Sequence, residues 1–271
     1  MTVPMSKIMI GCSRVGSLGN MTPFAETRLM LREAVEAGIR GFDTANIYGQ
    51  GDSERELGRL QAAYPQVELN IVTKAGFRHG RKAEIIQKVK PLLRPLVRLG
   101  SVKSKVQQVR AGIDRQCFEP GYLQGCVDGS LERLRLARLP GFLLHDPTEE
   151  DLRKLETASF LRSLRSGGKA SSVGVSLRDG SGIAAALALA PVDLLQLPVT
   201  AYESIRGTGM ADEIRDRGIH LSVRQVLRRP DGHVATLNEA LPPLLADPLV
   251  GAVIIGISKR SNLAELLESA A

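Results

Sequence analysis

The sequence predicts an α/β fold, a (β/α)8 barrel, from three observations. Eight short apolar runs occur without polar alternation, as is typical of parallel strands that are covered on both faces. Segments with apolar residues at helical spacing separate them. All but one of the steps between strand ends span 20 to 32 residues, close to one βα unit. The 271 residues fit a single barrel domain of the usual size, about 250 residues, so we expect one domain over residues 1–271.

The expected strands run through the whole chain. They are Ile8 to Cys12, Ile39 to Phe42, Asn70 to Thr73, Phe142 to Leu144, Val173 to Ser176, Leu194 to Leu197, His220 to Val223 and Ala252 to Ile255. A doubly wound open sheet is the alternative topology. It is disfavoured because no G-x-G-x-x-G sequence follows the first strand.

The expected helices begin at recognisable signals. Thr22-Pro23 places a cap residue and a first-turn proline before a helix over Phe24 to Ala37. Ser53 and Glu56 have the spacing of a capping box, which predicts a helix start near Ser53. Comparable helical patterns cover Asp151 to Leu164, Gly182 to Ala190, Tyr202 to Arg217 and Ser261 to Ala270.

One step, from Lys74 to His145, is 71 residues long and predicts an insertion between strands three and four. The insertion covers roughly residues 77–120 and has apolar residues at helical spacing from Ile85 to Val97. Between Arg78 and Arg110 there are ten Lys and Arg residues and one acid, so the whole basic excess behind the net charge of +7 lies there, and the rest of the chain is close to neutral. We expect a solvated amphipathic helix. A nucleic-acid or membrane surface is the alternative, but no aromatic residues are interleaved with the charges.

Composition limits the function classes. Three cysteines without a paired spacing indicate a reduced, cytoplasmic protein. Met1 to Lys7 does not resemble a signal peptide, and no apolar run reaches the roughly 20 residues of a membrane span. The cysteines and histidines have no metal-site spacing, so we expect no metal. We read His79, His220 and His233 as surface or loop residues.

Four titratable residues are expected at one corner of the barrel mouth, where the active sites of such barrels lie. Asp43, Lys74 and His145 end strands two, three and four, and Tyr48 follows Asp43 on its loop. A carbonyl that accepts hydride becomes an alkoxide and needs a proton donor. Tyr48 could supply the proton if the Lys74 ammonium lowers the pKa of its phenol, with Asp43 pairing Lys74 and His145 donating to the carbonyl oxygen.

These residues also carry a family resemblance. The run from Gly41 to Gly58 and the four residues Asp43, Tyr48, Lys74 and His145, in this order, resemble the signature and catalytic tetrad of the aldo-keto reductase superfamily. The resemblance implies an NADP(H)-dependent oxidoreductase that transfers hydride between the nicotinamide and an aldehyde, a ketone or the corresponding alcohol. The implied substrate is a small carbonyl or a sugar-like molecule.

The resemblance also implies a cofactor site. The run Val253 to Leu263 joins a strand end to a helix N-terminus, an anion-binding arrangement that in the family holds the 2′-phosphate of NADPH. The implied cofactor-binding residues are Ser176, Gln196, Arg224, Gly256, Ser258, Lys259, Arg260, Asn262 and Glu265. Ser176 and Gln196 resemble residues that bond the carboxamide, and Arg224 is expected to face the pyrophosphate. Leu177 and Leu266 depart from the family pattern, where asparagine is common.

The sequence leaves two other functions open. One is a barrel that binds NADPH and reports redox state to a partner protein with little turnover. The other is nucleic-acid or membrane association through Arg78 to Arg110, although the expectation is that the protein binds neither. We expect a monomer or a small homo-oligomer.

Overall fold

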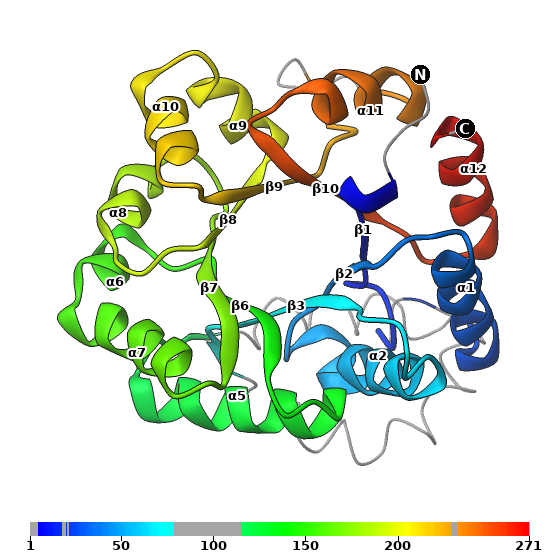
Figure 1. The fold of residues 1–271 in the computed structure, drawn as a ribbon, viewed down its shortest axis with the longest axis horizontal. Coiled ribbons are helices and arrows are strands. Elements are labelled where there is room, and N and C mark those ends of the chain that lie inside the picture. The colour runs from blue at the N-terminus through cyan, green and yellow to red at the C-terminus, as the bar shows by residue number, and fades with distance from the viewer. Residues whose placement is uncertain are drawn as a thin grey trace, which may run out of the picture.

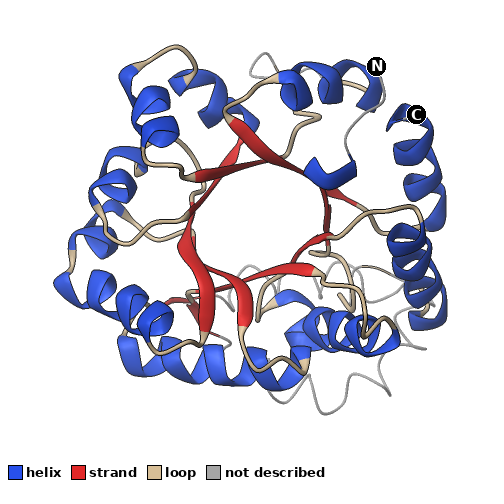
Figure 2. Ribbon diagram, viewed as in Figure 1, coloured by secondary structure: helices blue, strands red, loops and turns tan. Residues whose placement is uncertain are grey.

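Eight parallel strands close into a barrel with helices around its outside (Figures 1 and 2). The structure is a computed structural model that describes residues 5–17, 20, 22–78, 115–228, 232 and 234–270. The ring order is β1-β10-β9-β8-β7-β6-β3-β2, so the first and last barrel strands are neighbours. The strands are β1 (Ile8–Gly11), β2 (Gly41–Asp43), β3 (Asn70–Ala75), β6 (Leu139–His145), β7 (Ala170–Ser176), β8 (Leu194–Pro198), β9 (His220–Arg224) and β10 (Val250–Gly256). The predicted (β/α)8 barrel is confirmed.

The helices differ from the expectations mainly where one pattern covers two helices. Lys154 is extended and divides the expected Asp151 to Leu164 helix, and the left-handed Gly207 lies between the two parts of Tyr202 to Arg217. The helices α5 and α11 were not among those expected. The described helices are α1 (Phe24–Glu36), α2 (Asp52–Ala63), α5 (Pro120–Leu134), α6 (Glu149–Arg153), α7 (Leu155–Ser166), α8 (Ile183–Ala188), α9 (Val199–Ile205), α10 (Gly209–Asp216), α11 (Leu237–Ala246) and α12 (Arg260–Ala270), with short 3-10 helices η1 (Met5–Lys7) and η2 (Tyr48–Gly51).

Two apolar layers follow from the period-two alternation of strands. The large cluster lies between strands and helices and includes Ile10 and Phe142. A small cluster, which includes Met9, Val72 and Leu143, fills the barrel interior. Glycine is needed at position 174, because a Cβ there would overlap the Leu194 backbone of the neighbouring strand β8.

The same alternation places the side chains at the carboxyl ends of β3 and β6 on the inward face of the barrel. Lys74 lies two residues beyond the inward-facing Val72, and His145 two residues beyond the inward-facing Leu143. Side chains two residues apart on a strand share a face. The inward face of each strand therefore continues from an apolar core into polar groups at the carboxyl end.

The start and end of the expected insertion pair with each other. β4 (Phe77–Arg78) and β5 (Arg115–Gln116) form a two-stranded antiparallel sheet. The helix expected between Ile85 and Val97 lies outside the described residues. Within the described part of the chain, no helix is long and apolar enough to cross a bilayer.

Candidate active site

The loop that carries Tyr48 is tied to the start of α2, though by other bonds than a capping box. Gly51 is the residue before α2, and no side chain caps this helix, so the capping-box prediction is wrong. The Ser53 hydroxyl instead donates to the Cys12 carbonyl at 3.1 Å and bonds the Thr44 hydroxyl at 2.8 Å. These bonds connect the ends of β1 and β2 to the helix.

Glu54 extends this connection to β3. Its side chain is fully buried and accepts from the Thr73 hydroxyl at 2.6 Å and from Arg133 Nε at 2.7 Å. Thr73 precedes Lys74, and Arg133 belongs to α5. The acidic residues of the Ser-Glu-Arg-Glu run therefore have structural partners, because Glu56 likewise pairs with Arg28 and Arg59.

Lys74 and Asp43 form a buried ion pair at the barrel mouth. The Lys74 ammonium donates to Asp43 Oδ1 and, at 2.9 Å, to the Thr44 carbonyl. Burial lowers the pKa of Lys74, while the Asp43 carboxylate acts to raise it. The geometry agrees with the expectation that Asp43 holds and orients the ammonium.

Tyr48 lies beside this pair. The Lys74 nitrogen is 5.5 Å from the centre of the Tyr48 ring, and the Tyr48 ring meets the His145 ring edge to face at 5.8 Å. The sharp turn after Tyr48 needs glycine at position 49, where φ is 58° and a Cβ would lie 2.7 Å from the Val15 carbonyl. The four residues expected at one corner are therefore brought together there.

The pKa of the Tyr48 phenol departs from the expected direction. Burial raises it, the Asp43 carboxylate raises it further, and the positive charge of Arg224 lowers it by less. The expected lowering by Lys74 does not prevail, because burial and then the Asp43 carboxylate raise the pKa of the phenol. Tyr48 is therefore in its protonated, proton-donating form at neutral pH.

His145 is buried against Phe77, whose ring lies edge to face at 4.9 Å. Burial lowers its pKa well below the ordinary value, and the charges of Lys74 and Arg224 lower it further. The imidazole is therefore neutral at pH 7 and has one N–H to donate. His145 Nδ1 is buried and bonds no described residue.

Two predicted cofactor residues are joined to the ion pair. The Ser176 hydroxyl donates to Gln196 Oε1 at 2.8 Å, and Gln196 Nε2 donates to Asp43 Oδ1 at 2.8 Å. All three side chains are buried. Gln196 therefore helps to hold Asp43, a positioning role that spacing alone did not reveal.

Asp146 and Arg178 are site residues to which the sequence analysis gave no role. The Asp146 carboxylate lies 3.5 Å from Arg224 Nη2 and 3.7 Å from Arg178 Nε. Arg224 Nη2 also donates to the Leu177 carbonyl at 2.7 Å. The sequence pattern that could have pointed to Asp146 is an acidic residue directly after His145 at the end of a strand.

A cleft of about 640 Å³ begins at Tyr48 and Asp43 and extends to the N-terminal part of α12. Its size falls in the range of cofactor sites. Three guanidinium groups, from Arg14, Arg224 and Arg228, line it. The other lining residues are Gly11, Ser13, Gln225, Val226, Leu227, Leu237, Ile254, Ile255, Gly256, Ile257, Ser258, Asn262 and Glu265.

The cleft suits an elongated anionic ligand, because it joins those cations to a helix N-terminus. Four of the expected cofactor residues, Gly256, Ser258, Asn262 and Glu265, line its far end. Lys259 and Arg260 do not line it. Arg260 Nε donates to Glu33 at 2.9 Å on the exposed surface.

Comparison with known proteins agrees with this geometry. The model of the aldo/keto reductase family matches residues 7–230, which is most of the chain. The chain belongs to the aldo/keto reductase family.

Two curated relatives and one solved structure illustrate what this chain is similar to. It is 29% identical over 190 residues to a D-threo-aldose 1-dehydrogenase from a Pseudomonas species, and 25% identical over 219 residues to an aldo-keto reductase from Gibberella moniliformis. These matches cover 69% and 80% of the chain but only 54% and 56% of the relatives, so the chain spans about half their length. The holo form of aldo-keto reductase AKR11C1 from Bacillus halodurans has the same fold, with a TM-score of 0.71 and 20% identity over 97% of this chain and 86% of that one.

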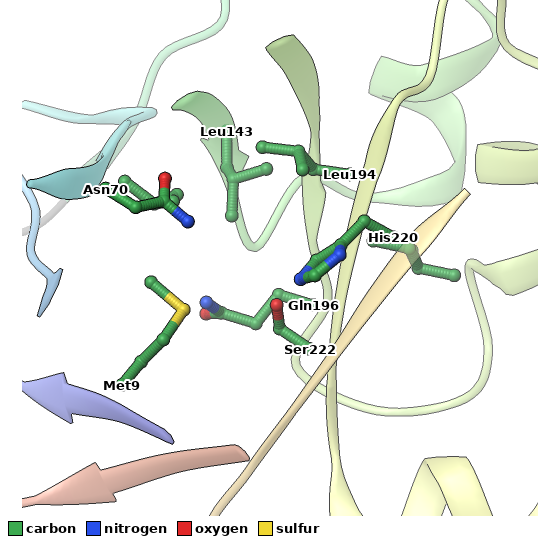
Figure 3. Close-up of a pocket in the computed structure, with 9 residues that line it drawn as sticks. Met9, Asn70, Leu143, Leu194, Gln196, His220 and Ser222 are labelled. Carbon is green, nitrogen blue, oxygen red and sulfur yellow. The ribbon is translucent and has the colours of Figure 1, made fainter. Parts of the chain in front are cut away.

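A second cavity of this chain lies inside the barrel (Figure 3). At about 20 Å³ it has room for a single water molecule and none for a cofactor. Gln196 and His220 both line this cavity. His220 is the first residue of β9 and is exposed, as expected, and its imidazole ring also faces the barrel interior. His79 and His233 lie outside the described residues. Among the residues that the structure describes, no three His, Cys, Asp or Glu side chains gather as metal ligands.

Proposed function

We propose that this protein is an NADP(H)-dependent oxidoreductase acting on an aldehyde or ketone, or on the corresponding alcohol. The observation that carries the proposal is the grouping of Tyr48, His145 and the Lys74–Asp43 ion pair, of which Tyr48 and Asp43 line a cleft that also holds three arginines. Membership of the aldo/keto reductase family supports the same chemistry.

Tyr48 is the proposed general acid. Its phenol is protonated, and a carbonyl oxygen that becomes an alkoxide takes up that proton. In the reverse direction the phenolate would accept the proton of the alcohol. Lys74 is proposed to stabilise the phenolate once the proton has left, with its charge partly offset by Asp43, and Asp43 keeps Lys74 oriented. The neutral His145 donates its N–H to the carbonyl oxygen and so fixes the orientation of the substrate.

The cofactor supplies the hydride when it is bound. Ser176 and Gln196 are proposed to bond its carboxamide, and Gly256, Ser258, Asn262 and Glu265 to bind its adenosine end. Lys259 and Arg260 are proposed to bind the 2′-phosphate, which favours NADP over NAD. This role requires the Arg260 guanidinium to leave Glu33 or to bind both groups.

The proposed substrate is a small carbonyl compound or a sugar-like alcohol. The relative named as an aldose dehydrogenase supports the sugar-like choice and an oxidative direction. The three free cysteines support a reducing compartment, and we propose the cytoplasm.

Fluorescence titration with NADPH and then NADH tests cofactor binding, and a panel of aldehydes, ketones and sugars tests turnover. We expect tighter binding of NADPH and measurable oxidation or reduction with at least one class. Absence of binding to both cofactors would contradict the proposal. Binding without turnover over the whole panel would instead favour the redox-sensing alternative.

A further inference from the structure

Arg224 has a fixed position between the two ends of the cleft. It ends β9 and lines the cleft together with Tyr48 and Asp43. Its Nη2 is held by the Leu177 carbonyl at 2.7 Å, and its Nε is buried without a partner among the described residues. A buried N–H without an acceptor is rare enough to call for an explanation. The guanidinium is therefore held by the Leu177 carbonyl at the end of β9, and its positive charge lies beside the cleft that Arg224 lines.

The charges around Arg224 do not cancel. Asp146 is its ion-pair partner, at 3.5 Å, but Asp146 is shared with Arg178. The Lys74 ammonium is matched by Asp43, and the buried imidazole of His145 is neutral. Two guanidinium groups thus face one carboxylate, and the end of the cleft beside Tyr48 keeps a positive charge.

A hydride donor or acceptor must lie beside the substrate carbon, and hence close to Tyr48, if the proposed function holds. The nicotinamide ring carries one positive charge when oxidised and none when reduced. The two redox forms therefore differ at the place where the Arg224 charge acts.

We propose that Arg224 sets the preference between the two redox forms of the cofactor, by weakening the binding of the oxidised, positively charged ring relative to the reduced ring. This inference rests on the proposed function. It differs from the expected contact of Arg224 with the pyrophosphate, because the phosphate charges are the same in both redox forms.

The ratio of dissociation constants, oxidised over reduced, isolates this effect. A contact with phosphate changes both constants equally and cancels from the ratio, whereas repulsion of the ring changes the numerator. By linkage, the same ratio is the shift of the cofactor's redox equilibrium on the protein. Asp146 offsets part of the Arg224 charge, so the effect is smaller than that of an unpaired cation.

The experiment measures NADPH binding by nicotinamide fluorescence and NADP⁺ binding by displacement of NADPH. Arg224→Met should lower the oxidised-to-reduced ratio about tenfold, equivalent to about 1.4 kcal/mol. Arg224→Lys keeps the charge and should stay near the wild-type ratio. Asp146→Asn removes the offsetting carboxylate and should raise the ratio, which gives a test in the opposite direction that does not depend on changing Arg224.

Arg228→Met is the matched control, because Arg228 lines the same cleft but lies beyond the cluster that Arg224 forms with Asp146 and the Leu177 carbonyl. It should weaken both redox forms alike and leave the ratio within about twofold. An unchanged ratio in both Arg224→Met and Asp146→Asn, with binding retained, overturns this inference and leaves the proposed function standing. Failure of the wild-type protein to bind either redox form overturns both.

Discussion

Tyr48 and Lys74 lie together, but their mutual effect depends on Asp43. The ammonium that would acidify the phenol is offset by the carboxylate it contacts, and burial then controls the phenol. Burial favours the neutral form of an acid. At the residue scale, the phenol of Tyr48 is therefore protonated at neutral pH and can donate its proton.

Tyr48→Phe should lower kcat by about 10²- to 10⁴-fold, because it removes the proton donor while keeping the ring against His145. Steady-state kinetics with the best substrate of the panel measures the loss. Tyr64→Phe is the matched control, since Tyr64 is remote from the cleft and its hydroxyl bonds Glu36 on the surface. Near-normal turnover in Tyr48→Phe would end the assignment.

The ionisation of Tyr48 should occur above the ordinary tyrosine pKa of about 10. The sign follows from burial, which stabilises the protonated phenol, so at pH 10 this group should be mostly protonated in the cofactor-free protein. The phenolate absorbance of wild type minus that of Tyr48→Phe reports this group alone. A phenolate signal from Tyr48 below pH 9 would show that the Lys74 charge prevails over burial.

At the scale of elements, α2 fixes the geometry of the mouth. Buried Glu54 joins α2 to Arg133 of α5 and to Thr73 of β3. Thr73 is the residue before Lys74, so this connection reaches the active-site corner. A buried carboxylate of this kind is held by its partners, and removal of one partner leaves a charge without compensation.

Arg133→Met should lower the free energy of unfolding by about 3 kcal/mol, because Glu54 then keeps, among the described residues, the Thr73 hydroxyl as its partner and loses the opposite charge. Denaturant unfolding measures the change. The control is Arg153→Ala, which breaks the exposed pair with Glu149 and should change stability by less than about 1 kcal/mol. Equal effects of the two substitutions would contradict the structural role of Glu54.

Two glycines in helices should respond to alanine with opposite signs. A Cβ at Gly58 of α2 would overlap the Arg133 backbone, so Gly58→Ala should destabilise by about 1 to 3 kcal/mol. Gly125 is an exposed residue within α5, with no atom near its Cβ position, and Gly125→Ala should stabilise by about 0.5 to 1 kcal/mol. Thermal unfolding of both variants checks the pair. Two stabilising results would show that α2 and α5 are not packed as described.

At the scale of the whole molecule, the closed barrel makes one long cleft from residues that are far apart in sequence. Ser13 follows β1, Arg224 ends β9 and Asn262 lies on α12, yet all three line the cleft. A ligand that fills it contacts segments from both ends of the chain, which meet because β1 pairs with β10. Binding should therefore stabilise the fold globally.

NADPH at about 100 times its dissociation constant should add about 2.7 kcal/mol of stability, because it binds only the folded state. The midpoint of thermal unfolding should rise by roughly 5 to 10 °C. NADH at the same concentration should give a smaller shift if the 2′-phosphate contributes. Equal shifts with both cofactors would contradict the proposed preference, and no shift with either would contradict cofactor binding.

The sequence determined the strands and the residues at their ends. A strand covered on both faces is mostly apolar, so its carboxyl end, where polar residues follow, is visible in the chain itself, whereas β6 and β7 begin at Leu139 and Ala170, before the expected Phe142 and Val173. This is why the order of residues along the chain was enough to place Asp43, Lys74, His145 and Ser176 at the barrel mouth. A prediction that depends on one local hydrogen bond is less reliable. The capping box predicted for Ser53 is absent, because its hydroxyl bonds Cys12 and Thr44 instead of capping α2.

Tertiary structure alone decided which polar groups form ion pairs and hydrogen bonds with one another. The Glu54–Arg133 pair, the Gln196–Asp43 bond and the position of Asp146 between two arginines join residues that are 79, 153 and up to 78 positions apart. The direction of the Tyr48 pKa was likewise settled there. Electrostatic energy depends on distance and burial in three dimensions, and neither is written in the spacing of residues along a chain.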